Sequence, residues 1–179
     1  MKFIKIILVT TLFTTAVACS KQLDSLLENP NSPSLSTADV DLLLNSVQLS
    51  FSYLFDDASN TGGQLTRQQA WGGPTYSSAY NPGSFNGLWN TGYTSILKNA
   101  NALIPLAQAQ KRYTASGMAK FMKAYTITLL VDAFGDIPYS EAVLGVANPN
   151  PKTDASAKIY EQAILLYDDA IKDFSTSGA

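Results

Sequence analysis

The sequence GMAKFMKAYTITLLVDAFGDIPYSEA, residues 117–142, decides the fold of this chain. The stretch 127–131 is apolar on nearly every side, and it follows a face of residues at helical spacing: Met118, Phe121, Met122 and Tyr125. A helix of that kind is central, because it has to be covered on several sides. Gly135 then provides a C-cap, and a proline follows three residues later. We therefore predict a central helix over residues 116–134.

Three further segments repeat apolar residues every three or four positions, as amphipathic helices do. They cover residues 36–57, 87–110 and 154–174. Ser36 is expected to cap the first of them, and Pro105 to kink or end the second. The apolar faces of the first and last are expected to include Phe55, Ile171 and Phe174.

The connections between these helices are long. Residues 57–85 are rich in glycine, amides and aromatics, and residues 139–152 contain two prolines, so both are predicted as loops. No segment alternates as a strand would. The sequence thus predicts an all-α fold of antiparallel helix pairs joined by long irregular loops.

The N-terminus has the pattern of a bacterial lipoprotein precursor. Lys2 and Lys5 precede an apolar run over residues 6–18 that is shorter than the ~20 residues of a membrane span. Cys19, the only cysteine, follows directly, although the usual lipobox leucine is replaced by Ala16. A secreted protein with an unpaired thiol is the alternative. We predict a signal peptide over 1–18, lipidation of Cys19, and an extended tether over 19–35.

Composition excludes several classes of function. The chain has 179 residues, a formal net charge of −2 and no histidine. It therefore has no basic footprint for nucleic acid, no histidine-based catalytic triad and no histidine-ligated metal. No cofactor is expected.

Three stretches together resemble the SusD/RagB family. The helix and turn of residues 117–142 resemble its most recognisable motif, which ends in Phe134-Gly-Asp-Ile-Pro-Tyr139. Residues 27–33, LENPNSP, resemble the lead-in after the lipidated cysteine. Residues 89–104, with Trp89, Tyr93, Asn99 and Asn101, resemble the second helix of the family.

That resemblance implies a tetratricopeptide-like helical scaffold, of which residues 36–179 would be the N-terminal part. It also implies a lipoprotein of the cell outer membrane, exposed at the surface. Such a protein binds oligosaccharides or peptides without catalysing a reaction and delivers them to a TonB-dependent, SusC-like transporter. An interaction scaffold without a small ligand, or an inactive fragment, are the alternatives.

The first long loop offers a candidate ligand site. Trp71, Tyr76 and Tyr80 could stack on sugar rings, while Arg67 and Gln68 could bond to hydroxyls. The alternative is that these aromatics fold back and cover the helices. A calcium loop beginning at residue 57 is disfavoured, because position 68 is glutamine where a bidentate glutamate is needed.

Two of the three acids around the central turn could form the catalytic carboxyl pair of a glycosidase: Asp132, Asp136 and Glu141. We favour a structural role for the Gly135–Pro138 turn, since short acids in turns accept hydrogen bonds from backbone amides. The sequence thus predicts a binding protein, with a glycoside hydrolase as a rival hypothesis.

Overall fold

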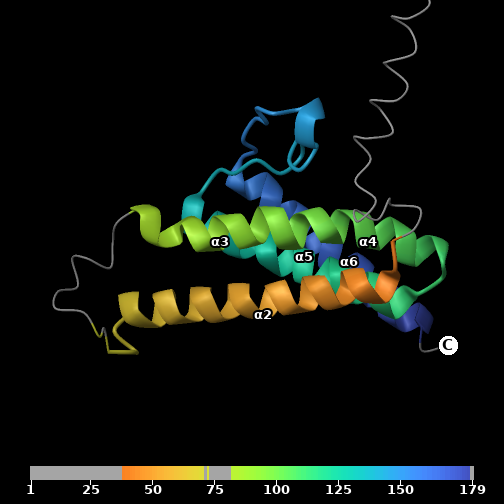
Figure 1. Ribbon diagram of the computed structural model, residues 1–179, viewed down its shortest axis with the longest axis horizontal. Helices are drawn as coiled ribbons and strands as arrows, with labels where there is room; N and C mark the ends of the chain where they lie inside the picture. Colours follow the sequence, from red (N-terminus) through yellow and green to blue (C-terminus); the bar gives the residue numbers. More distant parts are fainter. Residues whose placement is uncertain (1–37, 71, 73–81, 178–179) are drawn as a thin grey trace, which may run out of the picture. The chain divides into compact units, whose positions relative to one another are not determined.

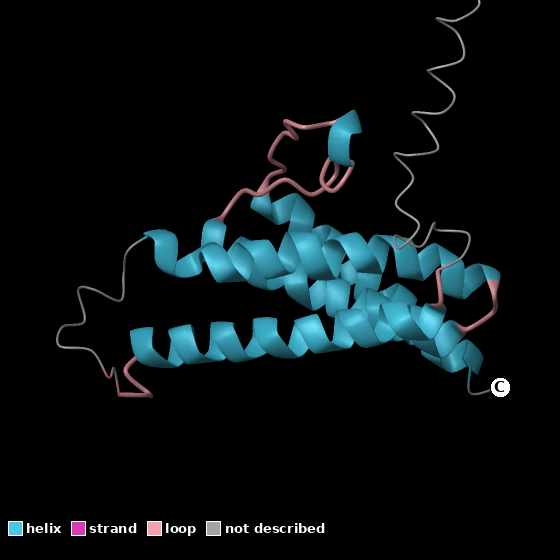
Figure 2. Ribbon diagram, viewed as in Figure 1, coloured by secondary structure: helices cyan, strands magenta, loops and turns pink. Residues whose placement is uncertain are grey.

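The computed structural model describes residues 38–70, 72 and 82–177. Its helices are α2 (Val40–Leu65), α3 (Asn86–Asn90), the π-helix η3 (Thr91–Leu97), α4 (Lys98–Ala109), α5 (Tyr113–Phe134) and α6 (Ser156–Ser177) (Figure 1). Short 3-10 turns cover Pro82–Phe85 and Gly145–Ala147. Within this part of the chain there are helices and loops but no strand (Figure 2), and the predicted all-α fold is confirmed. The predicted signal peptide, Cys19, the tether and Ser36 lie outside the described residues.

The helices pack as two antiparallel pairs. α2 pairs with the run α3–α4, and α5 pairs with α6 (Figure 1). Phe51 of α2 contacts Tyr125 of α5 edge to face, with ring centroids 5.3 Å apart. α5 contacts α2, η3, α4 and α6. Ile127 and Leu130 in its middle are completely buried. The prediction of a central third helix is therefore confirmed. None of the described helices combines the length and hydrophobicity that crossing a membrane requires.

α2 begins four residues later and ends eight residues later than the sequence indicated, and the expected N-cap at Ser36 is wrong. Its N-cap is Asp39, whose Oδ1 accepts hydrogen bonds from the N–H groups of Asp41 (2.7 Å) and Leu42 (3.3 Å). The expected end at residue 57 is wrong, because Ala58 and Leu65 continue the apolar stripe beyond Leu54 at helical spacing.

The second predicted helix forms as one continuous run with an unusual middle. Between α3 and α4 the backbone winds as a π-helix over Thr91–Leu97. Gly92 allows this wide turn to approach α5 closely, since a Cβ there would lie 3.0 Å from a methyl of the buried Leu130. The helix continues through Pro105 and does not end there. Leu103 and Ala107 are fully buried on either side of it, and their packing holds the helix together despite the missing N–H.

α4 ends in a Schellman motif with a lysine where glycine is usual. The N–H of Lys111 donates to the carbonyl of Gln108 (3.0 Å), and that of Arg112 donates to the carbonyl of Ala107 (2.8 Å). Lys111 takes a φ of +57°, a conformation that costs an L-residue about 1–2 kcal/mol. The turn places Arg112 beside the start of α2.

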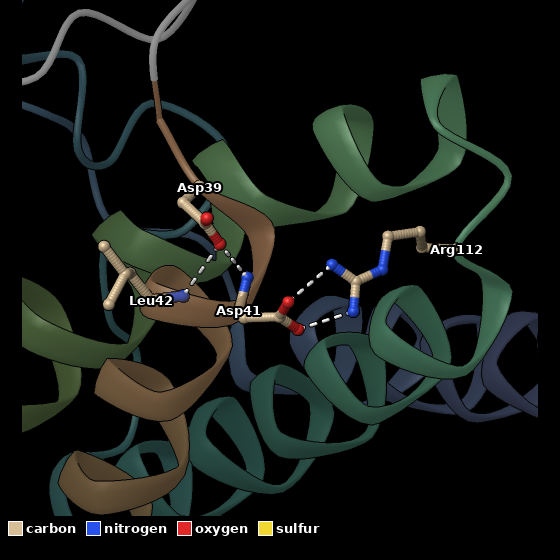
Figure 3. A network of polar contacts seen from close by, with 4 residues as sticks. All are labelled: Asp39, Asp41, Leu42 and Arg112. Carbon is tan, nitrogen blue, oxygen red and sulfur yellow. Dashed lines mark hydrogen bonds and ion pairs between the residues drawn. The ribbon is translucent and has the colours of Figure 1, made fainter.

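There the Arg112 guanidinium binds both carboxylate oxygens of Asp41, at 2.9 and 2.5 Å (Figure 3). This bidentate pair lowers the pKa of Asp41 and raises that of Arg112, chiefly through the side-chain hydrogen bonds. Both side chains are largely exposed, so the pair orients the α4–α5 corner more than it stabilises the fold.

A buried polar network joins α5 to α6. Lys120 Nζ lies 2.7 Å from Asp173 Oδ2, and the Ser116 hydroxyl donates to the same oxygen at 2.6 Å. All three residues are buried, with exposed fractions between 0 and 8%. Gly117 sits beside this network, where a Cβ would lie only 2.8 Å from the ring of Phe174. The small residues of α5 thus let α6 pack close.

The outer faces of the two flanking helices leave apolar side chains exposed. Phe55 is 49% exposed, Ile171 61% and Phe174 40%, so the prediction that they belong to the buried stripes is wrong. The same holds for Phe121 of α5, which is 44% exposed. The stripes themselves are narrower: Val40, Val47 and Leu54 are buried on α2, and Ile159, Ala163 and Ala170 on α6. In the described residues α6 packs mainly on α5, whereas α2 packs on α3, η3, α4 and α5.

The buried network predicts a large stability effect at Asp173. Asp173→Asn leaves the Lys120 ammonium buried without its counter-ion, so the free energy of unfolding should fall by about 3–5 kcal/mol. Urea denaturation followed by circular dichroism measures this. Asp169→Asn, which removes an exposed ion pair with Lys172 on the same helix, should cost less than about 0.5 kcal/mol.

The double variant Lys120→Met/Asp173→Leu removes both charges and keeps apolar volume, so it should recover most of the loss. Equal effects of the Asp173 and Asp169 substitutions would contradict the network's role.

Candidate functional site

The predicted ligand loop starts from a tightly closed helix end. The N–H of Gln69 donates to the carbonyl of Gly63 (2.9 Å), and Arg67 takes a φ of +59°. A Cβ on Gly63 would lie 2.9 Å from the side chain of Gln69, so the chain folds back over the last turn of α2. Arg67 and Gln68 are exposed at this loop entrance. Trp71, Tyr76 and Tyr80 lie outside the described residues.

A pocket lies at the base of this loop, where its two ends meet the C-terminal end of α5. Its volume is 190 Å³. The residues that line it come from α2, from the turn and helix after the loop, and from α5: Asp57, Ala58, Thr61, Gly62, Leu65, Ser84, Phe85, Leu88, Asp132 and Ala133. Neither Arg67 nor Gln68 lines it.

The pocket combines an apolar wall with a few polar groups. Phe85 is half-buried, and its ring meets Phe134 edge to face with centroids 6.4 Å apart. Asp57 and Asp132 provide carboxylate acceptors, and Thr61 and Ser84 provide hydroxyls. An aromatic ring beside hydrogen-bonding groups suits a ligand with an apolar face and hydroxyl or ammonium donors.

Asp132 is held by a hydrogen bond from α6. The Tyr160 hydroxyl donates to its Oδ1, and this bond is the main cause that raises the pKa of Tyr160. Asp57 approaches the start of α3, where a Cβ on Gly87 would lie 3.2 Å from Asp57 Oδ2. Asp57 belongs to helix α2, so the disfavoured calcium loop at this position does not form. No cluster of acids that could hold a metal occurs in the part of the chain that the structure describes.

The other two acids of the glycosidase hypothesis are engaged in loop structure. Asp136 Oδ1 accepts from the N–H (2.8 Å) and hydroxyl (2.6 Å) of Ser156, and so caps the start of α6. Glu141 accepts from the Asn148 amide at 3.1 Å and the Lys152 N–H at 3.2 Å. The Ser156 hydroxyl bond lowers the pKa of Asp136, whereas a glycosidase acid needs a raised one. The structural interpretation of the Gly135–Pro138 turn is therefore supported.

Asp154 fixes the loop between α5 and α6. Its Oδ2 accepts from the N–H groups of Tyr139 (2.9 Å) and Ser140 (2.8 Å), and its Oδ1 from the Ser140 hydroxyl (2.8 Å). Its own N–H donates to the carbonyl of Ile137 at 2.9 Å, which forms an isolated antiparallel bridge. The Tyr93 hydroxyl donates to the Pro138 carbonyl (2.6 Å) and joins this loop to η3. The pKa of Asp154 is lowered, first by the Ser140 N–H bond.

The sequence does not predict that Asp57 and Asp132 line one pocket. The predicted first helix ends at residue 57, and the sequence pattern groups Asp132 only with Asp136 and Glu141. One signal was present, because Leu54, Ala58, Thr61 and Leu65 continue a helical stripe through the polar segment. That stripe extends α2 as far as the level at which α5 ends.

Comparison with known proteins identifies the family. A SusD-like family model, described as "Starch-binding associating with outer membrane", matches residues 30–179. The chain belongs to this SusD-like family. The match includes the loop with Trp71, the pocket at its base and all the described helices. No curated protein matches the chain.

A solved structure agrees with this assignment. The crystal structure of a SusD/RagB family protein from Bacteroides thetaiotaomicron matches with a TM-score of 0.50 and 28% sequence identity. The match covers 76% of this chain and 30% of that one, so the SusD-like chain spans less than a third of the length of the protein it resembles. The expected SusD/RagB resemblance and the all-α SusD-like fold are both confirmed.

The hydrogen bonds to Asp154 predict an acid transition in the loop after α5. Because the folded pKa lies below the ordinary value of 3.8, the stabilisation is complete above pH 3.8 and is lost as the pH falls through the lower, folded pKa. The amide resonances of Tyr139 and Ser140, followed by NMR from pH 7 downward, should shift with a midpoint below 3.8. Ser140→Ala, which removes the hydroxyl donor, should move the midpoint toward 3.8. A wild-type midpoint at or above 3.8 would contradict the prediction.

Proposed function

We propose that this protein is a non-enzymatic binding lipoprotein of the outer membrane. It captures an oligosaccharide, or a peptide, and passes it to a TonB-dependent transporter of the SusC type. The family description, starch-binding and associated with the outer membrane, favours a glucan as the ligand. Lipidation of Cys19 would keep the protein at the membrane surface, since several buried acyl chains hold a protein far more firmly than one.

The pocket at the base of the 66–85 loop is the observation that supports ligand binding most directly. Phe85 supplies a half-buried ring, and the carboxylates of Asp57 and Asp132 can accept hydrogen bonds from sugar hydroxyls. The 66–85 segment carries Trp71, Tyr76 and Tyr80, which we propose complete the binding surface by stacking, with Arg67 and Gln68 bonding to hydroxyls at its entrance.

Titration calorimetry with maltoheptaose tests this proposal on the full chain. We expect saturable binding that is about two- to tenfold weaker in Phe85→Ala and in Trp71→Ala, because one aromatic stacking contact contributes about 0.5–1.5 kcal/mol. Tyr53→Ala is the matched control. Tyr53 is an exposed aromatic on α2 that does not line the pocket, so its removal should leave the affinity unchanged.

Tri-alanine serves as the peptide probe in the same titration. Binding of tri-alanine but not of maltoheptaose would assign a peptide ligand instead of a glucan. No binding of either would contradict the proposal and favour the interaction scaffold, for which the exposed apolar faces of α2 and α6 would then be the surface. Release of reducing ends that is lost in Asp132→Asn would instead establish the glycosidase alternative.

Membrane attachment has a separate test. Cells grown with labelled palmitate should incorporate the label into the wild-type chain and not into Cys19→Ser. The Ser substitution keeps the size of the side chain and removes the thiol that accepts the lipid. The variant should then leave the membrane fraction on washing in buffer, because it lacks the acyl chains that hold the wild-type protein there. Equal labelling of both chains would contradict lipidation at this residue.

A further inference from the structure

A second pocket, separate from the one below the 66–85 loop, lies between α4, α5 and the loop that follows α5. Its volume is 240 Å³. Its polar lining comes from Asn101, Lys123, Tyr139 and Ser140, and Val143 forms part of its wall. None of these residues takes part in the function proposed above.

The ammonium of Lys123 has no counter-ion among the described residues. Lys123 is half-buried, and its Nζ donates to Asn101 Oδ1 at 2.7 Å. It also lies 5.5 Å from the centroid of the Tyr139 ring. Lys120 and Arg112 bind the carboxylates of Asp173 and Asp41, whereas no described carboxylate lies within ion-pair distance of the half-buried Lys123. Burial lowers the pKa of Lys123, as expected for a charge without compensation.

The remaining hydrogen-bonding capacity of the pocket consists mainly of donors. Two N–H groups of Lys123 are unused by the described residues, and the Tyr139 hydroxyl makes no hydrogen bond to any of them. Burial, and to a lesser degree the charge of Asp154, raises the pKa of Tyr139, so its hydroxyl keeps the proton it can donate. Asn101 adds an amide NH₂ group, since its oxygen accepts from Lys123. Such a set of donors fits a ligand that accepts hydrogen bonds.

The pocket wall contains a strained residue. Val143 has a φ of +64°, which is a rare conformation for a β-branched side chain. It costs of order 1–3 kcal/mol and persists only where the surrounding structure imposes it, as at many ligand sites. The hydrogen bonds of the neighbouring Ser140 and Glu141 hold the loop in place around it.

We propose that this pocket binds the carboxylate of a small ligand, with Lys123 as the charge partner and Asn101 and Tyr139 as further donors. A single ammonium compensates a monoanion. A dianion such as phosphate would keep an unpaired charge, close to the carboxylate that Asp154 already presents to Tyr139 and Ser140. The aromatic ring of Tyr139 gives the ligand an apolar surface to lie against. The carboxylate could come from a uronic acid or from the end of a peptide.

NMR titration of the full chain with matched pairs of probes tests the proposal. Glucuronate is compared with glucose, and N-acetyl-alanyl-alanine with its C-terminal amide. We expect saturable shifts of the Ser140 and Val143 amides with at least one acid and with neither neutral partner. The acid that binds more tightly identifies the source as sugar or peptide. Absence of shifts with both acids, or equal shifts with acid and neutral partner, would overturn the proposal.

A pair of lysine variants assigns the charge. Lys123→Met keeps the length of the side chain and should weaken binding of the acid at least tenfold. Lys98→Met is the control, because Lys98 is an exposed lysine of α4 outside the pocket lining. This variant should bind the acid with the affinity of the wild type. Retained affinity in Lys123→Met would overturn the proposal. If that variant does not fold, the wild-type titration with the matched probes still decides the question.

Discussion

The buried ion pair between Lys120 and Asp173 constrains how the last helix packs. A charge with so little access to water has to be paired, and here the pair also receives the hydroxyl of Ser116. α6 can therefore lie against α5 only in the rotation and register that bring Asp173 to Lys120. An apolar pair of the same volume could stabilise the contact equally, but it would also allow α6 to shift along α5 into other registers. We interpret the network as a device that selects one arrangement of the two helices.

The opposite end of α6 is fixed as well, which determines the loop before it. Asp136 caps the helix through Ser156, and Asp154 binds the backbone of Tyr139 and Ser140. The segment between α5 and α6 is thus attached at several points, although it lacks regular structure. Its geometry follows from the placement of α6, and it forms one wall of the Lys123 pocket. The packing of two helices thereby shapes a site formed mainly by a loop.

Local sequence signals predicted the helices well and the contacts between distant residues poorly. The apolar run around Ile127 predicted a central helix, because a helix that is apolar on nearly every side has to be buried on every side. The end of α2 was predicted too early, because Gly62 and the polar residues before it have weak helix propensity. In the structure, packing against α5 keeps this segment helical. The pocket could not be predicted, because Asp57 and Asp132 belong to different helices. They line the same pocket only once the chain has folded. That no carboxylate of the described residues pairs with Lys123 is likewise a property of the folded structure.

The π-helical stretch Thr91–Leu97 has a consequence for the evolution of this chain. A π-turn accommodates about one residue more than an α-helical turn of the same rise. Loss of a single residue here could convert it to ordinary winding, while Leu88 before it and Leu103 after it continue to face the interior. The same helix could equally have arisen by a one-residue insertion. Relatives that differ in length by one position within this stretch would therefore keep their cores aligned on both sides of the gap.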